Sequence, residues 1–585
     1  MKILLTAINA KYIHSNLAVY SLRAFAVQEE QQYADELEIA EYTINQTTDS
    51  ILMDLYQKKP DVLCFSCYLW NIEYVRTLLR ELPKILPETK IWLGGPEVSY
   101  HAKQMLEELP QVSGIMCGEG EETFLELVRF YHGDVESLEQ IAGIVCRTQE
   151  NGVSVIRTTA PREVMDLSRV PFVYQDMDVF NHKIIYYESS RGCPFSCSYC
   201  LSSVDKCLRF RDLELVKREL TFFIEQEVPQ VKFVDRTFNC RHSHAMAVWS
   251  YLKEHDRGVT NFHFEVAADL LNEEEIELIQ SMRPGLIQLE IGVQSTNEQT
   301  IREIRRTMHF ANVAAAVKRI HTVGNIHQHL DLIAGLPFED YESFRRSFCD
   351  TYALRPEQLQ LGFLKVLKGS YMEEKAADYK LVYQDAPPYE VLSTRWLSYA
   401  DIIRLKGIEE MVEVYYNSGQ FAHTMELLEH GFEDAFSMYE ALAEYYQKHG
   451  YFEISHTRAA RYEILWSFIC EQWNAGGALK QNVAAEPEHL RQMLTYDLYL
   501  RENVKNRPAF AGAETVTKEE AASFYDMEAK HHRYLIGYEQ YDKRQLRKMT
   551  HLEKINGELC LFDYQNRNIL TNQAAVYKIN ELYVG

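Results

Sequence analysis

Residues 188–200 read ESSRGCPFSCSYC and place Cys193, Cys197 and Cys200 at the spacing C-x3-C-x2-C. An iron–sulfur cubane is usually held by four thiolates, so three cysteines leave one iron without a protein ligand. An open position on a metal is typical of a catalytic site, because a structural site closes its coordination sphere. The stretch therefore predicts a 4Fe–4S cluster that keeps one iron free for a small molecule.

Two structural alternatives account less well for these cysteines. A zinc knot needs a second pair of cysteines or histidines at matching spacing. The one nearby cysteine, Cys207, follows Cys200 at C-x6-C, which is a poor ligand spacing. Unligated buried cysteines belong in an apolar core, whereas this loop contains glycine, proline and serine. The cluster with an open iron is the favoured interpretation.

The composition describes a large acidic globular protein. The chain has 585 residues, of which 46% are hydrophobic and 25% are charged, and its formal net charge is −24. At roughly 150 residues each, three or four domains fit this length. Binding to nucleic acid or to an anionic membrane needs clustered Lys and Arg, so neither partner is expected.

The sequence predicts a cytoplasmic protein. No apolar run approaches the roughly 20 residues that a membrane-spanning helix needs. The start, MKILLTAINAKYIHSN, is apolar only as far as Ile8 and indicates a first strand rather than a signal peptide. The twelve cysteines fit a reducing compartment, where neighbouring cysteines are more often metal ligands or redox groups than disulfides.

Residues 1–135 alternate apolar strands with amphipathic helices. The expected strands read KILLTAI, LEIAEYTI, DVLCFSCYLW, KIWLGG and SGIMCG. Continuous apolar strands between such helices indicate a parallel sheet that is covered on both faces. We expect a doubly wound α/β domain of the flavodoxin or Rossmann type, with any ligand at the carboxyl ends of the strands. A dinucleotide is not expected, because no G-x-G-x-x-G follows the first strand.

Three further regions follow the first domain. Residues 136–183 are expected to be a connector that contains the hairpin AGIVCRTQENGVSVIRT. Residues 184–375 contain six predicted strands with intervening helices, which favours a (β/α)6 partial TIM barrel with its site at the carboxyl ends of the strands. Residues 376–585 are expected to form a mainly helical accessory domain. Its stretch TYDLYLRENVKNRP (495–508) either closes over the barrel mouth or, the favoured reading, packs as a helix through an aromatic stripe.

The stretch RGCPFSCSYC, with Tyr199 before the last cysteine, resembles the signature of the radical SAM superfamily. The resemblance extends to about residue 370. It implies that the open iron binds the amino and carboxylate groups of S-adenosylmethionine (SAM), and that the reduced cluster cleaves SAM to a 5′-deoxyadenosyl radical. It also implies an electron donor of the flavodoxin or ferredoxin type.

The same resemblance implies contacts with SAM along the barrel. Tyr199 is expected beside the adenine, and Asp235 or Asn239 of VDRTFN near the SAM amino group. Many cobalamin-dependent relatives have paired aspartates where this chain has Asp235 and Arg236. Later strands supply the other expected SAM contacts, which are Glu265, Glu290, Gln294, Ser295 and Gly335.

Several of these barrel residues have structural interpretations as well. Glu265 and Glu290 are also compatible with ion pairs inside the barrel. The glycine is also compatible with ordinary turn geometry. Arg305 and Arg306 follow the fourth strand, and one of them could clamp a carboxylate, but a solvated helix face is the favoured reading.

A doubly wound domain ahead of such a barrel resembles a cobalamin-binding domain. Glycines at strand ends let the backbone approach a bulky ligand and its phosphate tail. The expected cobalamin contacts are His14, Ser66, Tyr68, Gly94, Gly95, Gly118 and Gly120. The usual D-x-H-x-x-G signal is broken around His14, because neither its aspartate nor its glycine is present. His14 is therefore either a cobalt ligand or, by default, a loop histidine that makes hydrogen bonds.

Other polar and sulfur-containing residues of this domain are open to two readings. Trp70 and Asn71 either form a wall for the corrin or belong to the core. Cys64 and Cys67 form C-x2-C, but residues i and i+3 of an extended strand point to opposite faces. Core packing is therefore favoured over a redox pair for these two cysteines.

Together these patterns predict a radical SAM enzyme that uses a 4Fe–4S cluster and cobalamin to methylate an unactivated carbon of an unknown small molecule or peptide. A radical ring closure or oxidative rearrangement, as in anaerobic porphyrin ester cyclases, is the alternative. A tRNA methylthiotransferase is disfavoured, because its N-terminal cysteine triad and basic tail are missing. A cobalamin or SAM sensor is less favoured, because a sensor has no need of the cysteine loop.

Overall fold

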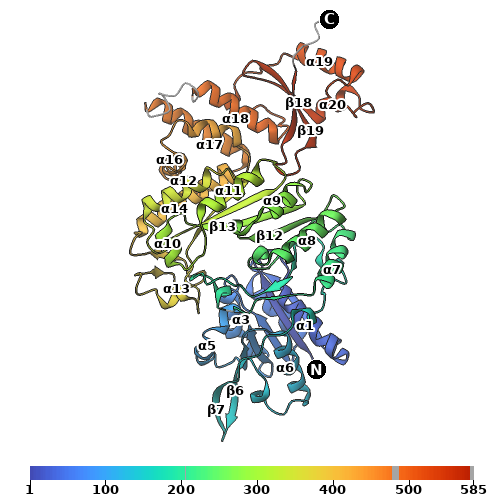
Figure 1. Cartoon of the computed structure of the whole chain (residues 1–585), viewed down its shortest axis with the longest axis vertical. Helices are drawn as coiled ribbons and strands as arrows, with labels where there is room; N and C mark the ends of the chain where they lie inside the picture. Colours follow the sequence, from blue (N-terminus) through green and yellow to red (C-terminus); the bar gives the residue numbers. More distant parts are fainter. Residues whose placement is uncertain (205, 477–485, 580–585) are drawn as a thin grey trace.

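The computed structural model of the chain describes residues 1–204, 206–476 and 486–579. Figure 1 shows three regions that follow one another along the long axis of the molecule. The N-terminal α/β region lies at one end, a second α/β region lies in the middle, and helices with a small sheet lie at the other end. None of the helices in these ranges has both the length and the apolar character needed to cross a bilayer.

A seven-stranded sheet forms the N-terminal region, in the order β2-β1-β3-β4-β5-β6-β7. Its first five strands pair in parallel, as the sequence predicts. They are β1 Ile3–Asn9, β2 Leu37–Thr43, β3 Val62–Ser66, β4 Lys90–Gly94 and β5 Gly114–Met116. The helices among them are α1 Leu17–Glu29, α2 Thr48–Lys58, α3 Ile72–Ile85, α4 Pro96–Ser99, α5 Ala102–Glu108 and α6 Glu121–His132. Apolar side chains form two separate buried clusters in this region, because helices cover both faces of the sheet.

The two cysteines of C-x2-C lie in different clusters of this sheet. Cys64 is buried with Trp92 and Phe25, whereas Cys67 is buried with Phe65 and Ile72. The prediction that these cysteines pack in the core and do not meet is confirmed.

The hairpin at 144–158 belongs to the first sheet. Its strands are β6 Ile144–Glu150 and β7 Val153–Thr158, and β6 pairs antiparallel with β5. The sequence pattern placed this hairpin in the connector. The backbone groups along the free edge of β5 need partners, and the hairpin supplies them. The wider division of the chain at residues 135, 183 and 375 stays a prediction.

The middle region contains a six-stranded parallel sheet in the order β15-β14-β13-β12-β11-β8. The strands are β8 Ile185–Tyr187, β11 Gln230–Phe233, β12 Asn261–Val266, β13 Ile287–Gln294, β14 His327–Ala334 and β15 Gln358–Phe363. Helices run between them: α7 Leu213–Glu225, α8 His242–His255, α9 Glu273–Gln280, α10 Glu298–Glu303, α11 Phe310–His321 and α12 Tyr341–Tyr352. All six strands coincide with the predicted ones, and their carboxyl ends meet at one edge because they are parallel.

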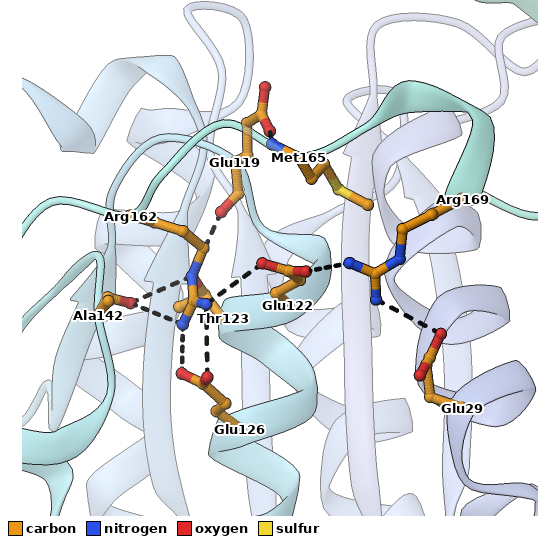
Figure 2. Close-up of polar contacts among 9 residues, drawn as sticks. All are labelled: Glu29, Glu119, Glu122, Thr123, Glu126, Ala142, Arg162, Met165 and Arg169. Carbon is orange, nitrogen blue, oxygen red and sulfur yellow. Dashed lines mark hydrogen bonds and ion pairs between the residues drawn. The ribbon is translucent and has the colours of Figure 1, made fainter. Parts of the chain in front are cut away.

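The segment that joins the two sheets is held against the N-terminal helices by two arginines (Figure 2). Arg162 makes a close ion pair with Glu126 and lies 3.5 Å from Glu122. Arg169 lies 2.6 Å from Glu122 on α6 and 3.6 Å from Glu29 on α1. The connector is therefore fastened along its length to the region that precedes it.

The C-terminal region is mainly helical and ends in a three-stranded antiparallel sheet. Its helices are α13 Tyr371–Glu374, α14 Tyr399–Val412, the π-helical turn Glu413–Asn417, α15 Ala422–Glu429, α16 Ala435–His449, α17 Arg458–Asn474, α18 Pro487–Arg501, α19 Lys518–His531 and α20 Lys543–Met549. Its strands are β18 Thr550–Ile555, β19 Glu558–Arg567 and β20 Ala574–Ile579, and a short pair is formed by β16 Val382–Tyr383 and β17 Val391–Ser393. Helix α18 packs on α15, α17, β18 and β20, at the end of the molecule away from the N-terminal region. The favoured reading of 495–508, a packed helix, is confirmed for residues 495–501, whereas residues 502–508 follow the end of α18.

Other parts of the chain cover both edges of the middle sheet. At one edge, the side-chain amide of Asn417 donates to the carbonyl oxygen of Leu359 and accepts from its N–H, both at 2.9 Å. At the other edge, the backbone N–H of Ile184 donates to the carbonyl of Ile13 at 2.7 Å, and Ile184 forms a parallel bridge with His14. The three regions are thus joined at the backbone of Leu359 on β15 and of Ile184, which directly precedes β8.

Candidate functional site

A cavity of about 940 Å³ lies between the N-terminal sheet and the middle sheet. The carboxyl ends of β1, β3, β4 and β5 line one side, and the ends of β8, β11 and β12 line the other. All seven residues that the sequence predicts for cobalamin line it, namely His14, Ser66, Tyr68, Gly94, Gly95, Gly118 and Gly120. Of the residues predicted for SAM, Glu265 lines this cavity.

Two glycines allow the N-terminal wall of the cavity to form. Gly95 has φ +106°, and a Cβ built on it would lie 2.5 Å from the carbonyl oxygen of Cys67. Gly118 has φ +79° and no atom within 4 Å of a built Cβ. Both positions favour glycine by conformation, and Gly95 also does so by contact. The resulting bare backbone is a cradle of the kind that a large planar ligand requires.

Aromatic and amide side chains complete this wall in different ways. The rings of Tyr68 and Trp70 stack with centroids 4.5 Å apart, and Trp70 donates to the carbonyl of Ile8 at 3.0 Å. Trp70 and Tyr68 line the cavity. Asn71 is completely buried and donates to the carbonyls of Ile8 and Ser66. Of the two readings, Trp70 is a wall residue and Asn71 is a core residue.

His14 reaches across to the middle region. Its Nδ1 lies 2.6 Å from the hydroxyl oxygen of Tyr186, which lies on β8 and also lines the cavity. Burial lowers the pKa of His14, and the positive charges of Lys11 and Lys232 lower it further. A neutral imidazole with a hydroxyl partner agrees with the default reading, and the ligation of cobalt by His14 stays a prediction.

The glycine-rich loop before α6 connects the cavity to the cysteine loop through carboxylates. Glu121 lies 2.8 Å from Arg191, which also lies 2.8 Å from Glu188. Glu119 makes a close ion pair with Arg209. It also accepts a hydrogen bond from the backbone N–H of Met165 (Figure 2). Arg191 stands two residues before the first cysteine, so the N-terminal region fixes the start of that loop. Sequence reasoning missed this network; its one signal was the run of acids in CGEGEETF.

The cysteine loop brings the three predicted thiols into one neighbourhood. Cys193 and Cys197 are buried, and Cys200 is partly exposed. Burial raises the pKa of Cys193, and the other two thiols raise it further because they are close enough to repel a thiolate. Among the described residues, no three His, Cys, Asp or Glu converge closely enough to hold one metal ion. A cubane presents its irons at separate corners, so its ligands do not converge in that way.

Gly192 sets the entry to the loop. It has φ +91°, and a built Cβ would lie 2.7 Å from the carbonyl oxygen of Cys207. A side chain at this position would therefore push the start of the cysteine loop away from Cys207. It would disturb the adjacent pairing of β9 Ser190–Arg191 with β10 Arg209–Phe210. Three thiols, a tight glycine turn and a neighbouring cation suit an anionic iron–sulfur cluster, and the glycine cradle suits a corrin.

That neighbouring cation is Arg306, which the sequence placed on a solvated helix face. Its Nη1 lies 3.9 Å from the sulfur of Cys197 and donates to the hydroxyl of Tyr199 at 3.3 Å, and its Nη2 donates to the carbonyl of Gly292. The solvated reading was wrong for Arg306, because α10 ends at Glu303 and the chain then turns inward. Arg305 instead lies over the ring of Tyr371, at 3.4 Å.

We expect Arg306→Gln to lower the reduction potential of the cluster by roughly tens of millivolts. A positive charge beside Cys197 favours the more negative, reduced state, and the substitution removes that charge while keeping an amide donor. Redox titration followed by electron paramagnetic resonance measures the potential. Arg305→Gln is the matched control and should leave the potential unchanged. Equal potentials in all three proteins would contradict the assigned role.

Asp235, which the sequence predicts as a SAM contact, is held by the two serines that precede the cysteine loop. It is completely buried, and its oxygens accept hydrogen bonds from the N–H of Ser189 at 3.0 Å, the hydroxyl of Ser189 at 2.7 Å and the hydroxyl of Ser190 at 2.6 Å. Burial raises the pKa of Asp235 to about 7, although these hydrogen bonds oppose the shift. The side chain therefore fixes the backbone that leads into the cysteine loop, while a contact with SAM stays a prediction.

The raised pKa of Asp235 predicts a specific pH dependence of stability. Between the ordinary value of 3.8 and about 7, the folded protein binds a proton that the unfolded chain does not. The contribution of Asp235 to the free energy of unfolding therefore falls as pH rises through this window, by an amount on the order of a few kcal/mol. Asp235→Asn should lose stability at pH 5 through a lost hydrogen bond, yet lose less as pH rises to 8. Melting temperatures measured across this range test the prediction, and parallel curves for the two proteins would contradict it.

The other residues predicted for SAM lie on the barrel strands in distinct settings. Glu290 lies 3.0 Å from both Lys232 and His263, and although burial alone would raise its pKa, these partners lower it to about 2. Glu265 lies 3.6 Å from Arg236. The alternative reading of both glutamates, an ion pair inside the barrel, is thus present in the structure.

Residues at the ends of β13 and β14 have unusual backbone conformations. Gln294 has φ +70° at a register shift of β13, and its buried side-chain oxygen has no hydrogen-bond partner among the described residues. Ser295 is buried and donates to Glu339 at 2.6 Å, so it is a core residue. Gly335 has φ +91°, and a built Cβ would lie 2.7 Å from Val391. Asn239 is buried and holds both backbone groups of Ala267 at 2.9 Å. Of the side chains of Gln294, Ser295 and Asn239, that of Gln294 has a buried oxygen that accepts no hydrogen bond from the described residues.

The segment after β15 forms part of the contact between the two sheets. Lys368 lies 2.8 Å from Glu97, which also accepts a close hydrogen bond from Tyr389. His101 lies 3.2 Å from Glu373. Sequence reasoning missed these residues, because the pairs join positions more than 270 residues apart.

Three family models match the chain in sequence order. A model described as a B12 binding domain matches residues 3–128, and one described as the radical SAM superfamily matches residues 187–348. A third model, described as a protein of unknown function (DUF4080), matches residues 377–576. The two cofactor-related models thus cover most strands of the two sheets that line the cavity; β6, β7 and β15 lie outside the matched ranges.

Curated relatives resemble part of the chain. The cobalamin-dependent radical SAM methyltransferase TokK of Streptomyces tokunonensis is 24% identical over 308 residues, which are 49% of this chain and 44% of TokK. The 2-(S-pantetheinyl)-carbapenam-3-carboxylate methyltransferase of Streptantibioticus cattleyicolor is 26% identical over 311 residues, again 49% of this chain and 44% of the relative. The chain therefore spans less than half the length of these two relatives.

A solved structure shares the fold over more of the chain. The structure of the cobalamin-dependent S-adenosylmethionine radical enzyme OxsB, with aqua-cobalamin and S-adenosylmethionine bound, aligns with a TM-score of 0.57 at 14% identity. The alignment covers 85% of this chain and 79% of OxsB. The likeness therefore shows a common arrangement of the backbone.

Proposed function

Because this chain is a radical SAM protein with an N-terminal B12-binding domain, we propose that it is a cobalamin-dependent radical enzyme that methylates an unactivated carbon of its substrate. The observation that carries the proposal is the shared cavity, in which all seven residues predicted for cobalamin face the ends of the barrel strands. We also propose that the middle region is a (β/α)6 partial barrel and the C-terminal region an accessory domain.

The residues would divide the cofactors between the two regions. Cys193, Cys197 and Cys200 would hold the cluster, and the seven cavity residues named above would hold the corrin. Tyr199, Asp235, Glu265, Glu290, Gln294 and Gly335 would contact SAM, and Asp235 would also hold the backbone before the cysteine loop. When bound, the cluster, SAM and cobalamin supply the reducing electron, the radical and the methyl group.

The chain's own part is to hold these groups in a fixed geometry. Arg306 contacts Cys197 and Tyr199 of the cysteine loop and the backbone of β13. The cysteine loop and β13 are therefore held in a fixed position relative to each other. Arg191 makes ion pairs with Glu121 and Glu188 and so connects the cysteine loop to the glycine-rich loop of the N-terminal region. Groups that are held in fixed positions react within one complex and do not have to meet by diffusion. Walls from two regions also exclude water from a reactive site.

The partners are proposed more broadly. The substrate is a small molecule or peptide, and reduction requires a flavodoxin-type or ferredoxin-type donor. We place the protein in the cytoplasm, where reduced thiols persist.

The experiment that tests the proposal starts from protein purified without oxygen and loaded with iron, sulfide and hydroxocobalamin. Its absorption spectrum should show iron–sulfur charge-transfer bands and corrin bands together. With a reductant and SAM, a methylating enzyme should release both 5′-deoxyadenosine and S-adenosylhomocysteine. Release of 5′-deoxyadenosine alone would favour the cyclase alternative. Release of neither product would favour a sensor and overturn the proposal.

A further inference from the structure

Most charged side chains around the cavity already have close partners. Arg191 is held by Glu121 and Glu188 at 2.8 Å, and Lys232 is held by Glu290 at 3.0 Å. Arg191 therefore has few donors left for a ligand, and the charge of Lys232 is already compensated by Glu290.

Arg236 is the exception among the described lining residues. Its side chain is 54% exposed, and its one ion pair, with Glu265, is 3.6 Å long. This separation is too long for a hydrogen bond, and the guanidinium donates none to any other described residue. A guanidinium carries five N–H donors, so its binding capacity is unused.

Arg236 lies between the cysteine loop and the N-terminal wall of the cavity. It lines the cavity at the carboxyl end of β11, and it is close enough to Cys200 and Tyr68 for both to stabilise its charge. Cys200 belongs to the cluster loop, and Tyr68 belongs to the cobalamin wall. A group bound by Arg236 would therefore lie between the two cofactors.

The charge of Glu265 does not block an anion at this place. Burial raises the pKa of Glu265, and Lys232 on β11 offers it a second positive charge beside that of Arg236. Arg236 can therefore turn its donors to a ligand while Glu265 keeps a compensating cation. A planar guanidinium matches the two oxygens of a carboxylate or phosphate, which a lysine does not.

We propose that Arg236 binds an oxyanion, a carboxylate or a phosphate, carried by the substrate. This inference rests on the proposed function for the place of the substrate, but its test needs no catalysis. SAM also carries a carboxylate, so the experiment has to separate the two sources.

The first test maps arginine modification by phenylglyoxal in the anaerobic, cluster- and cobalamin-loaded protein. Saturating SAM is present, and inorganic phosphate is the probe. Phosphate should protect Arg236 from modification, as read by mass spectrometry of its peptide, and should leave Arg302 unprotected. Arg302 is the control because it lies on α10 with 77% of its side chain exposed.

The second test measures binding of radiolabelled phosphate by equilibrium dialysis. Arg236→Gln should weaken binding by at least about tenfold, because it removes charged hydrogen bonds, while Arg302→Gln should match the parent protein. Arg236→Lys should recover part of the affinity, since it keeps the charge without the planar fork.

Two results would overturn the inference. Equal phosphate binding by the parent protein and Arg236→Gln would remove the oxyanion site. Full protection of Arg236 by SAM alone, with weaker SAM binding in Arg236→Gln, would assign the carboxylate to SAM instead of the substrate. Failure of the proposed function would appear as absent SAM cleavage, which leaves the phosphate result unaffected.

Discussion

Alanine in place of Cys193, Cys197 or Cys200 should abolish cluster assembly and, with it, the cleavage of SAM. Each thiol is expected to hold one corner of the cluster, and the loop has no fourth cysteine at ligand spacing to replace a lost one. Iron analysis of the reconstituted protein should fall from about four atoms per chain to nearly none. Production of 5′-deoxyadenosine should fall below detection in the same samples.

Cys207→Ala is the matched control for this experiment. Cys207 follows the loop by seven residues and is solvent-exposed, whereas two of the three loop cysteines are buried. We expect this variant to keep the iron and the SAM cleavage of the parent protein. Zinc in place of iron, or SAM cleavage that survives all three loop substitutions, would end the assignment of the loop.

The second large effect is expected at the cobalamin wall. Gly95→Ala should weaken the binding of hydroxocobalamin by about a hundredfold, because the new Cβ combines a strained positive φ with a collision. The colliding atom is the backbone oxygen of Cys67, which cannot rotate away as a side chain could. The loop at the end of β4 has to move, and the cradle moves with it. Titration followed by the corrin absorption bands measures the affinity.

Two other glycines of the same cavity separate the collision from the strain. Gly118→Ala has a positive φ but no contact, so its loss should be limited to about tenfold. Gly94→Ala meets Met116 at 3.6 Å, which is ordinary contact, and should lose less affinity for cobalamin than Gly95→Ala. Thermal melting of each variant shows whether it is folded. Equal affinities for folded Gly95→Ala and Gly94→Ala would contradict the cradle.

The strands and their parallel pairing could be predicted because each is a continuous apolar run between amphipathic helices. The hairpin β6–β7 was recognised but assigned to the connector, since nothing in its own residues states which edge it will join. That choice depends on the open backbone of β5, a partner about 30 residues earlier in the chain.

The candidate site could be predicted best where one short loop supplies the feature. The cysteine triad and the glycines predicted for cobalamin belong to this kind, and these four glycines all line one cavity. Arg306 was misjudged because its surroundings come from a distant segment, the cysteine loop. The hydrogen bonds of Asp235 were missed for the same reason, since they come from two serines before that loop. Arg236 was noticed as a departure from paired aspartates, but its lack of close partners is a property of the folded cavity.

The side-chain amide of Asn417 at the outermost strand has a consequence for how the protein can be handled. It occupies the donor and acceptor of Leu359 that a foreign strand would otherwise use, while the opposite edge is occupied by the backbone of Ile13. A fragment trimmed to residues 184–375 would lose Asn417 and Ile13 and expose backbone groups at both edges of the middle sheet, where strands of other molecules can pair and start aggregation. Expression of residues 1–585 as one polypeptide should therefore keep the protein dispersed.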